Sequence, residues 1–362
     1  MVRFKSQILL LINILFFSRL FASPFTIAVI PDSQNYTDYR YQTISTPPFA
    51  IDFVDVYRHQ IEYIAKNSVS RGGDIAFAIH LGDNVLHHGD QEIEWELADK
   101  TISILDNTIP FCMVPGNHDY DERVRREDKS WAFNGTSHYI KYFGNQSKHF
   151  KDKEWYKGSF NDGLSSWGRF SAGGIEFLFI GLELEAGDMV LEWAQNVIDQ
   201  NKNIPTIVIT HEYLYRGYDS NNPGVHPIQT NNRYRSDSGD CNSAVEIWEK
   251  FISKNNQIFL VLCGHSYNKE HGEAARTDIN NDGYKVYELL SDYEGRNTLF
   301  KFLQISDSAY GGDGWLRLLK FDLEEQQIHV QTYSTEFKRY EKDFDSDFII
   351  KFDWQWDERF GK

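Results

Sequence analysis

Cysteine is scarce in this chain of 362 residues, which has only Cys112, Cys241 and Cys263. Three cysteines cannot form a framework of disulfides, although an exported protein would permit a single bridge. No Cys-x-x-Cys pair is present, so a zinc knuckle is excluded. Because Cys112 and Cys263 each lie within an apolar, strand-like run, we predict small buried thiols at these positions and no bridge.

Basic residues are also few relative to acidic ones. Lys and Arg number 37 against 53 Asp and Glu, which gives a formal net charge of −16. Such a chain repels polyanions, so we expect no surface that binds nucleic acid. An anionic substrate would need cations at its site to offset this field, and the charge balance therefore already suggests a bound metal.

Strongly apolar stretches are confined to the start of the sequence. Arg3 and Lys5 precede a largely apolar run at residues 8–17, and Ala22 is a suitable last residue before cleavage. The run is shorter than the ~20 residues that span a membrane. We therefore predict that residues 1–22 are an export signal, that the protein is secreted or periplasmic, and that the mature chain has no membrane span. Removing this segment takes away three bases and no acid, which leaves a net charge of −19.

The rest of the sequence contains enough apolar material for a large core, with 41% hydrophobic and 15% aromatic residues. From residue 24 to about 265, short β-branched runs alternate with longer amphipathic stretches, which is typical of α/β layering. The predicted strands are 26–30, 75–81, 110–114, 175–180, 206–210 and 258–262. The predicted helices are 51–67, 91–105, 188–201 and 244–254.

From about residue 283 onward the pattern changes to short β segments separated by turns, at 285–290, 315–323 and 327–333. No linker rich in Pro, Gly or Ser divides this tail from the rest, so we predict that its strands complete a second sheet of the same domain. Two long polar loops are also predicted, at 121–162 and 213–240. Long ordered loops in compact domains are often functional, and these two would flank the site.

Five predicted strands end on side chains that can bind metal or move protons. These side chains are Asp32, Asp83, the pair Asn117 and His118, His211, and His265. One such residue alone is usually a turn residue or a satisfied core group. Five of them indicate a site, because the ligand crevice of a layered α/β fold lies at the carboxyl ends of its strands. Carboxylates, an amide oxygen and imidazoles are the ligands expected for Mn, Fe or Zn in a hydrolytic site.

These motifs, in this order, resemble those of the calcineurin-like metallophosphoesterases. The most specific is Gly-Asn-His-Asp at residues 116–119, and the match spans about residues 26–270. The tail segment 311–322 is similar to that of a secreted branch whose first motif reads Pro-Asp-Thr-Gln. The resemblance implies a layered αββα sandwich at residues 23–297, with residues 298–362 as C-terminal strands that complete it.

The resemblance also implies two divalent metal ions, chosen among Mn, Fe, Zn and Mg. Asp83 would bridge the ions and Asp32 would bind the first. The second ion would be held by Asn117, His211 and His265. His118 resembles the catalytic His of the family, which is not a ligand. Two cations about 3.5–4 Å apart acidify a shared water and neutralise phosphate oxygens, while an imidazole can protonate the leaving oxygen.

Two motifs depart from the family pattern, and both departures affect the first ion. The usual Asp-x-His is Asp-Ser-Gln and ends at Gln34, and the usual Gly-His-x-His ends at Tyr267. Gln34 can offer a carbonyl oxygen, whereas Tyr267 is a poor ligand unless it is ionised. Asn268 or His271 is near enough in sequence to reach inward, which spacing alone does not decide. We therefore predict one tight metal site and a first site that is weaker, harder in its ligands, or empty.

The sequence thus predicts an exported, metal-dependent hydrolase of phosphate monoesters or diesters. The alternative from another class is an inert binding protein that keeps the fold but has lost the first ion. The enzyme is favoured because the catalytic His is retained together with the full ligand set of the second ion. The 9 Trp and 20 Tyr give slight support to a mono-metal sugar-binding protein, but a core can absorb them. The substrate and the oligomeric state stay open.

Overall fold

The computed structural model describes residues 23–42, 44–46, 49–215, 228, 240–267, 272–296, 298, 311–352 and 356–360. The predicted export signal, most of the predicted loop 213–240, and both Asn268 and His271 lie outside these residues. Within the described part of the chain, none of the helices combines the length and the hydrophobicity that a membrane crossing requires.

Fully buried, apolar strands form the centre of the molecule. β1 (Phe25–Ile30), β4 (Ile75–His80) and β12 (Ile258–Cys263) are buried at every position. Strands that are covered on both faces read as continuous apolar runs, which is why these segments stand out in the sequence. All six strands predicted up to residue 262 are present, with ends that differ by one residue at most.

The first of two large sheets has the strand order β17-β16-β15-β1-β4-β5, and β18 pairs with β16. Its other strands are β5 (Phe111–Met113), β15 (Trp315–Asp322), β16 (Gln327–Ser334), β17 (Arg339–Tyr340) and β18 (Asp347–Lys351). β1, β4 and β5 are parallel, and β15 is antiparallel to β1. The carboxyl ends of β1, β4 and β5 therefore meet at the same edge.

The second sheet has the order β13-β14-β12-β11-β10-β9-β8. Its other strands are β8 (Tyr156–Phe160), β9 (Ser165–Ala172), β10 (Ile175–Gly181), β11 (Thr206–Ile209), β13 (Glu273–Ile279) and β14 (Lys285–Ser291). β10, β11, β12 and β14 run parallel to one another. This sheet also presents a row of strand ends at one edge.

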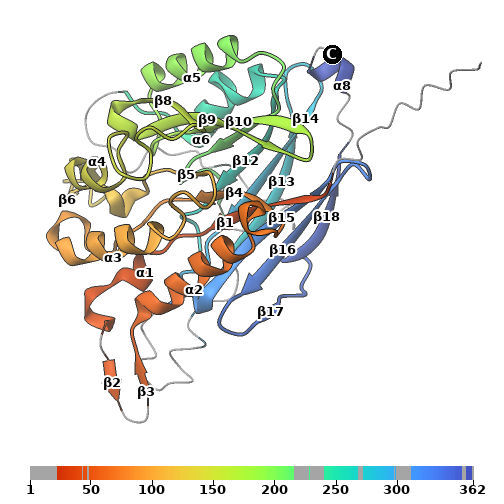
Figure 1. Ribbon diagram of the computed structural model, residues 1–362. Coiled ribbons are helices and arrows are strands. Elements are labelled where there is room, and N and C mark those ends of the chain that lie inside the picture. Colours follow the sequence, from red (N-terminus) through yellow and green to blue (C-terminus); the bar gives the residue numbers. More distant parts are fainter. Residues whose placement is uncertain are drawn as a thin grey trace, which may run out of the picture.

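Helices cover the outer faces of both sheets (Figure 1). The helices α2 (Phe53–Lys66), α3 (Glu92–Ile102) and α4 (Ser137–Phe143) pack on the first sheet, and α5 (Asp188–Gln200) and α6 (Ala244–Lys250) on the second. A third apolar cluster fills the space between the sheets, where the ring of Phe77 stacks on Phe170 with centroids 4.2 Å apart. The predicted αββα sandwich is confirmed.

Short elements fill the connections between these layers. The short helices are α1 (Gln34–Thr37), α8 (Trp356–Arg359) and the 3-10 turns η1 (Tyr39–Tyr41), η2 (Val69–Arg71), η3 (His88–Asp90), η4 (Asn117–Asp119), η5 (Asn161–Gly163), η6 (Ile252–Lys254) and η7 (Gly312–Gly314). Two hairpins are formed by β2 (Ile44–Thr46) with β3 (Phe49–Ile51) and by β6 (Glu122–Arg125) with β7 (Trp131–Asn134). The turn η4 holds the Asn and His of the Gly-Asn-His-Asp motif.

Two sequence predictions need correction. The tail does not complete a single second sheet: β14 joins the sheet of β12, whereas β15 and β16 extend the sheet of β1. Strand pairing over such sequence distances is not encoded in local periodicity. The predicted loop 121–162 also contains regular structure, namely β6, β7, α4 and β8. There Tyr139 and Phe143 of α4 are buried against the first sheet, and this burial stabilises a helix in a polar stretch of sequence.

The three cysteines are free thiols. Cys112 and Cys263 are buried, as the sequence predicts. Burial raises the pKa of the Cys112 thiol to about 12, which keeps it protonated and unreactive at neutral pH.

Candidate metal centre

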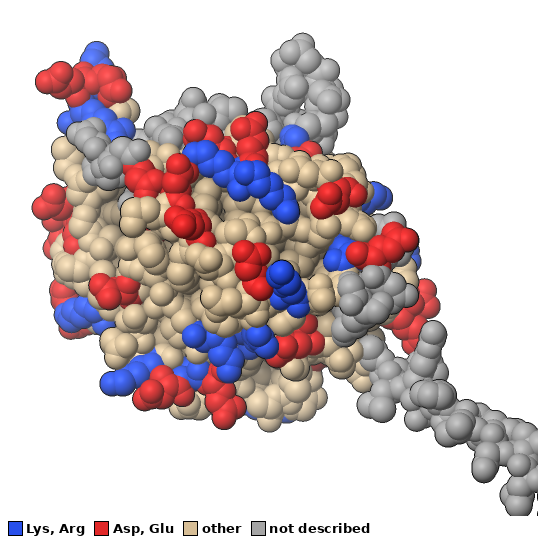
Figure 2. All heavy atoms as spheres, turned by 90° about the horizontal axis from the view of Figure 1, so that it is seen from above, with Lys and Arg blue, Asp and Glu red and all other residues tan. Residues whose placement is uncertain are grey.

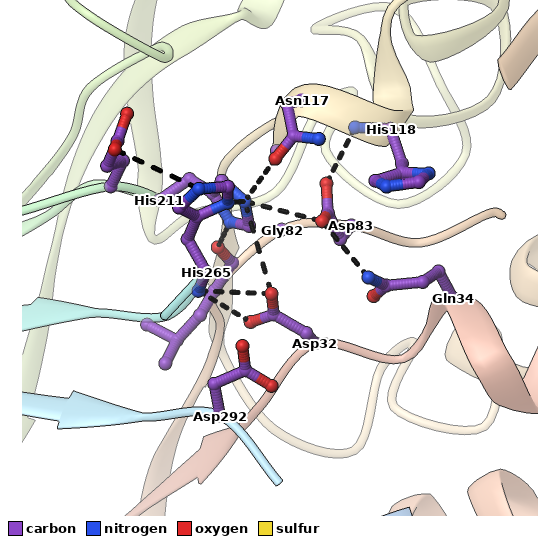
Figure 3. A network of polar contacts seen from close by, with 12 residues as sticks. Asp32, Gln34, Gly82, Asp83, Asn117, His118, His211, His265 and Asp292 are labelled. Atoms are coloured by element: carbon purple, nitrogen blue, oxygen red, sulfur yellow. Dashed lines mark hydrogen bonds and ion pairs between the residues drawn. The ribbon is translucent and has the colours of Figure 1, made fainter. Parts of the chain in front are cut away.

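The structure brings the sequence-predicted site residues together at the edge where strands of both sheets end (Figure 3). Asp32, Asp83 and Asn117 follow β1, β4 and β5 of the first sheet. His211 and His265 follow β11 and β12 of the second sheet. Each side chain stands in the loop directly after a buried strand, so the rigid sandwich fixes the position of the site.

The Nε2 atom of His211 lies at the centre of this group. It is 3.4 Å from Asp83 Oδ2, 3.2 Å from Asn117 Oδ1 and 3.2 Å from Nδ1 of His265. Asp32 Oδ2 is further away, at 4.0 Å. The other ring nitrogen of His211 donates to the carbonyl of Leu81 at 2.8 Å, which directs Nε2 toward the group.

This spacing fits a metal ion. Asp83, His211 and His265 each offer one donor atom, and these atoms lie within 4.8 Å of one another. Ligands about 2.1 Å from one ion at tetrahedral angles would be about 3.4 Å apart, close to the separations around His211 Nε2. Nitrogen donors mixed with carboxylate and amide oxygens suit Zn, Fe or Mn.

Two glycines allow backbone and carboxylates to approach closely. A Cβ atom on Gly116 would lie 2.1 Å from Oδ1 of Asp83, and one on Gly264 would lie 2.2 Å from Oδ1 of Asp32. Any side chain at either position would displace the carboxylate, which explains why both motifs begin with glycine. Asp83 itself has a φ of 53°, a conformation that costs a non-glycine residue of order 1–3 kcal/mol. Strain of this kind is common where a side chain must be aimed at a ligand.

The carboxylates of Asp83 and Asp32 differ in their electrostatic surroundings. Burial alone raises the pKa of Asp83, but His211, His118 and His265 outweigh burial and hold that pKa well below its ordinary value. Burial also raises the pKa of Asp32, and the neighbouring carboxylates of Asp292, Asp83 and Glu294 raise it further. Asp83 is therefore an anion among imidazoles, whereas Asp32 is surrounded mainly by other acids.

The same interaction shifts the pKa of His211 in the opposite direction. Burial lowers its pKa, but the contact with Asp83 outweighs burial and raises the pKa to about 9. Beyond His211, the side chain of Glu212 lies near His265, with Oε1 3.8 Å from its Nε2. A carboxylate behind an imidazole is a common means of orienting a metal-binding His.

His118 lies beside this group with its ring held in one orientation. Its backbone N–H donates to Asp83 Oδ1 at 2.7 Å, and its Nδ1 donates to the carbonyl oxygen of Leu86 at 2.8 Å. The ring stacks on His88, with centroids 4.9 Å apart. Because Nδ1 is committed to a carbonyl, proton exchange with another group falls to Nε2.

One of the two predicted departures from the family pattern, Gln34, lies against Asp83. Gln34 is buried, and its Nε2 donates to Asp83 Oδ2 at 3.2 Å (Figure 3). Among the described residues, no donor lies within hydrogen-bond distance of Gln34 Oε1. A buried acceptor without a donor suits a cation, so Gln34 fits the role of an oxygen ligand. Tyr267 is half-buried.

Sequence reasoning did not single out Asp292 and Glu294. Both are buried, and they directly follow β14, whose end lies beside that of β12. Asp292 lies next to Asp32 in Figure 3. The signal that could reveal them is an acidic residue after an apolar strand, which the sequence shows after residues 285–290. The local pattern does not place that strand beside β12, because this depends on their parallel pairing.

Two further polar residues support the loops that carry the site. Asp119 is buried and accepts hydrogen bonds from Gly116 N, Asn84 N and Asn84 Nδ2 at 2.7–3.0 Å. His80 is also buried; its Nδ1 accepts from Gly82 N, and its Nε2 lies 3.1 Å from the hydroxyl of Ser33. Burial lowers the pKa of His80 to about 3, so it stays neutral. His80 therefore supports the loops that carry Asp32 and Asp83.

Comparisons with known proteins agree with this geometry. A family model described as calcineurin-like phosphoesterase matches residues 25–269, which is more than half of the chain. The chain is also similar to "Uncharacterized protein YvnB" of Bacillus subtilis (strain 168), with 28% identity over 293 residues. That alignment covers 80% of this chain but 19% of the relative, so the chain spans about a fifth of that protein's length.

Proposed function

The chain belongs to the calcineurin-like phosphoesterase family, and on this premise we propose that it is a metal-dependent hydrolase of phosphate monoesters or diesters. The observation that carries the proposal is the position of His118. A ring with a single nitrogen left for proton transfer lies next to Asp83, whose carboxylate joins the group around His211 Nε2. A binding protein without catalysis has no need of an imidazole held in this way.

We propose that Asp83 is shared between two metal ions drawn from Mn, Fe, Zn and Mg. Asp32 and Gln34 would hold the first ion. The second would be held by Asn117, His211 and His265. Bound there, divalent ions supply Lewis acidity and an acidified water as nucleophile. The chain's own contribution is to fix the donors: the strand ends position them, and the hydrogen bond from His211 to Leu81 orients the central imidazole.

In this proposal His118 is the general acid. When protonated at Nε2, it would donate that proton to the oxygen of the departing alcohol, a step that contributes roughly 10²–10⁴-fold in known enzymes. The hydrogen bond from Nδ1 to Leu86 keeps the ring aimed during the transfer. The hydrogen bond from the His118 backbone to Asp83 couples the position of the acid to that of the shared carboxylate.

We also propose that the protein is exported. Residues 1–22 have a basic start, an apolar run and a small residue at a suitable cleavage point, so we propose that they direct the chain out of the cytoplasm. Mass spectrometry of the protein recovered after expression of the full sequence checks this directly. We expect a new N-terminus near residue 23, and retention of residues 1–22 in an exported or unexported product would contradict it.

A substrate screen tests the enzymatic proposal. Protein reloaded with Mn²⁺ is assayed against phosphate monoesters and diesters, with Asp83→Asn as the inactive reference. We expect hydrolysis of at least one class by the unmodified protein and loss of that activity in Asp83→Asn. If neither class is hydrolysed while metal binds normally, the fold serves as a binding module and the proposal fails.

A further inference from the structure

The end of β14 brings an acidic residue to the Asp32 side of the site. β12 and β14 pair in parallel register, with Cys263 opposite Leu290. Two residues beyond these partners are His265, which follows β12, and Asp292, which follows β14. The backbone of His265 donates to Asp32 Oδ2 at 3.1 Å, so Asp32, His265 and Asp292 are neighbours (Figure 3).

The acids on this side of the site are buried together. Asp292 is 0% exposed, Asp32 2% and Glu294 8%. The nearest arginine in sequence, Arg296, points elsewhere, because it forms ion pairs with Glu273 and Glu341. Buried like charges are costly unless a cation compensates them. The amide of Gln34 is a second feature that suits a cation, and it does not depend on the charge of the acids.

Gln34 adds a buried oxygen acceptor beside Asp83. Its Nε2 contacts Asp83 Oδ2, so the whole amide group lies at the site. Oε1 is bonded to the same carbon as Nε2, is buried, and finds no donor in the described part of the chain. The two amide atoms are distinguished only through their hydrogen bonds, and turning the amide would present this oxygen to Asp83 Oδ2. A cation satisfies the amide oxygen and the carboxylates at once.

We propose that Asp292 takes the place of the imidazoles that the family pattern puts on the first ion. This inference rests on the proposed function, because it presupposes that the site holds metal. The first ion would then be bound by oxygen alone, from Asp32, Asp83, Gln34 and Asp292. Oxygen ligands favour Mg, Mn or Ca over Zn, whereas the imidazoles of the second site favour Zn or Fe. One chain would therefore hold two chemically different metals.

Glu294 positions Asp292 in this arrangement. Its backbone N–H donates to Asp292 Oδ1 at 3.1 Å. Its own carboxylate accepts from Nδ2 of Asn35 at 3.1 Å, next to Gln34 in sequence. The loop after β14 is thus joined to helix α1 beside the proposed ion, and Glu294 adds a further negative charge to the surroundings of that ion.

Manganese binding tests the inference without relying on activity. The protein is first given one equivalent of Zn²⁺ to fill the nitrogen-containing site, and Mn²⁺ is then titrated and followed by electron paramagnetic resonance. We expect one Mn²⁺ per chain in the unmodified protein. Asp292→Asn should weaken that Mn²⁺ by at least about tenfold while Zn²⁺ is retained. Asp282→Asn, in the exposed turn that precedes β14, is the matched control and should bind as the unmodified protein does.

Pulsed measurements on the same Mn²⁺ need no variant, so a folding defect of Asp292→Asn leaves the inference testable. An oxygen-only site shows no coupling to directly bound ¹⁴N, and a strong ¹⁴N coupling would overturn the inference. Unchanged Mn²⁺ affinity in folded Asp292→Asn would overturn it as well. Neither result affects the proposed function, which fails separately if ester hydrolysis proceeds without metal.

Discussion

At the scale of single residues, the proposed role of His118 depends on the neighbouring ring of His88, which does not take up a proton at physiological pH. Burial and the adjacent His118 lower the pKa of His88 to about 4, so the ring that stacks on His118 is neutral at physiological pH. His88 Nδ1 donates to the carbonyl of Tyr120, as His118 Nδ1 does to Leu86. The two rings are thus fixed in parallel, and it is the backbone of His118 that donates a hydrogen bond to Asp83.

Replacing His118 should affect substrates according to their leaving groups. Because a general acid matters most when the departing oxygen is strongly basic, His118→Ala should lower kcat on alkyl esters by roughly 10²–10⁴-fold and on nitrophenyl esters far less. Metal content, measured by elemental analysis, should stay the same. Equal losses on both substrates would mean that His118 is a ligand or a structural residue.

Restoring the missing imidazoles should change how many metals are held tightly. Gln34 offers oxygen where the family pattern has nitrogen, so the unmodified protein should keep close to one transition metal after extensive dialysis. The double change Gln34→His with Tyr267→His should raise this number toward two. Elemental analysis decides the matter, and two tightly held transition metals in the unmodified protein would show that the first site is not weak.

At the scale of elements, the sequence was informative where a strand is buried on both faces. The runs before Asp32, Asp83, His211 and His265 read as continuous apolar segments, so both the strands and the residues after them could be predicted. Asp292 follows a strand that is buried after its first residue, but its nearness to Asp32 depends on the parallel pairing of β14 with β12. That pairing joins segments that local periodicity cannot relate.

The connection between α3 and the segment after α4 depends on a buried histidine. Nε2 of His149 lies 3.0 Å from Asp99 Oδ1, and Nδ1 lies 2.9 Å from Asp106 Oδ1. Both nitrogens can donate only when the ring is protonated. Burial opposes this charge, but Asp106 and Asp99 outweigh burial and raise the pKa of His149.

This contact predicts a pH-dependent contribution to stability. Since the folded-state pKa is raised, the stabilisation is complete below the ordinary value of about 6.5 and is lost as pH rises through the folded pKa. His149→Gln should lower the free energy of unfolding by about 1.5–3 kcal/mol at pH 5.5, and by less at pH 9. Urea unfolding at both pH values measures the difference.

The control for this measurement is His59→Gln on α2. His59 is half-exposed and contacts a single acid, Glu336, so its loss should change the free energy of unfolding by no more than about 0.5 kcal/mol. A loss in His149→Gln that is equal at both pH values would contradict the proposed ionic contact and indicate a packing effect.

At the scale of the whole molecule, the layered fold was predictable but the division of the tail was not. Alternating strands and helices indicate α/β layering whatever the order of the strands, and the resemblance to the family implies the αββα sandwich. The addition of β15 to β1 in antiparallel orientation, by contrast, joins segments almost 300 residues apart, as the partners Phe25 and Phe321 show. The aromatic rings of these two residues stack with centroids 4.9 Å apart, which fixes the tail to the first strand of the core.

Charge acts on the whole molecule as well. On the face shown in Figure 2, acidic and basic side chains are interspersed, so the acid excess is not gathered into one patch there. The net charge of −16 nevertheless opposes the approach of a phosphate ester. The buried acids of the site add to this repulsion until metal neutralises them, so we expect that substrate binds only to the metal-loaded protein.

The most direct measurement compares ester hydrolysis by the same protein with and without metal. The protein is stripped with a chelator, the chelator is removed, and the rate is measured before and after Mn²⁺ is added, on the best substrate found in the screen. Our account predicts that stripping abolishes hydrolysis, that Mn²⁺ restores it, and that Asp83→Asn is not restored. Full activity in the metal-free protein would contradict the account.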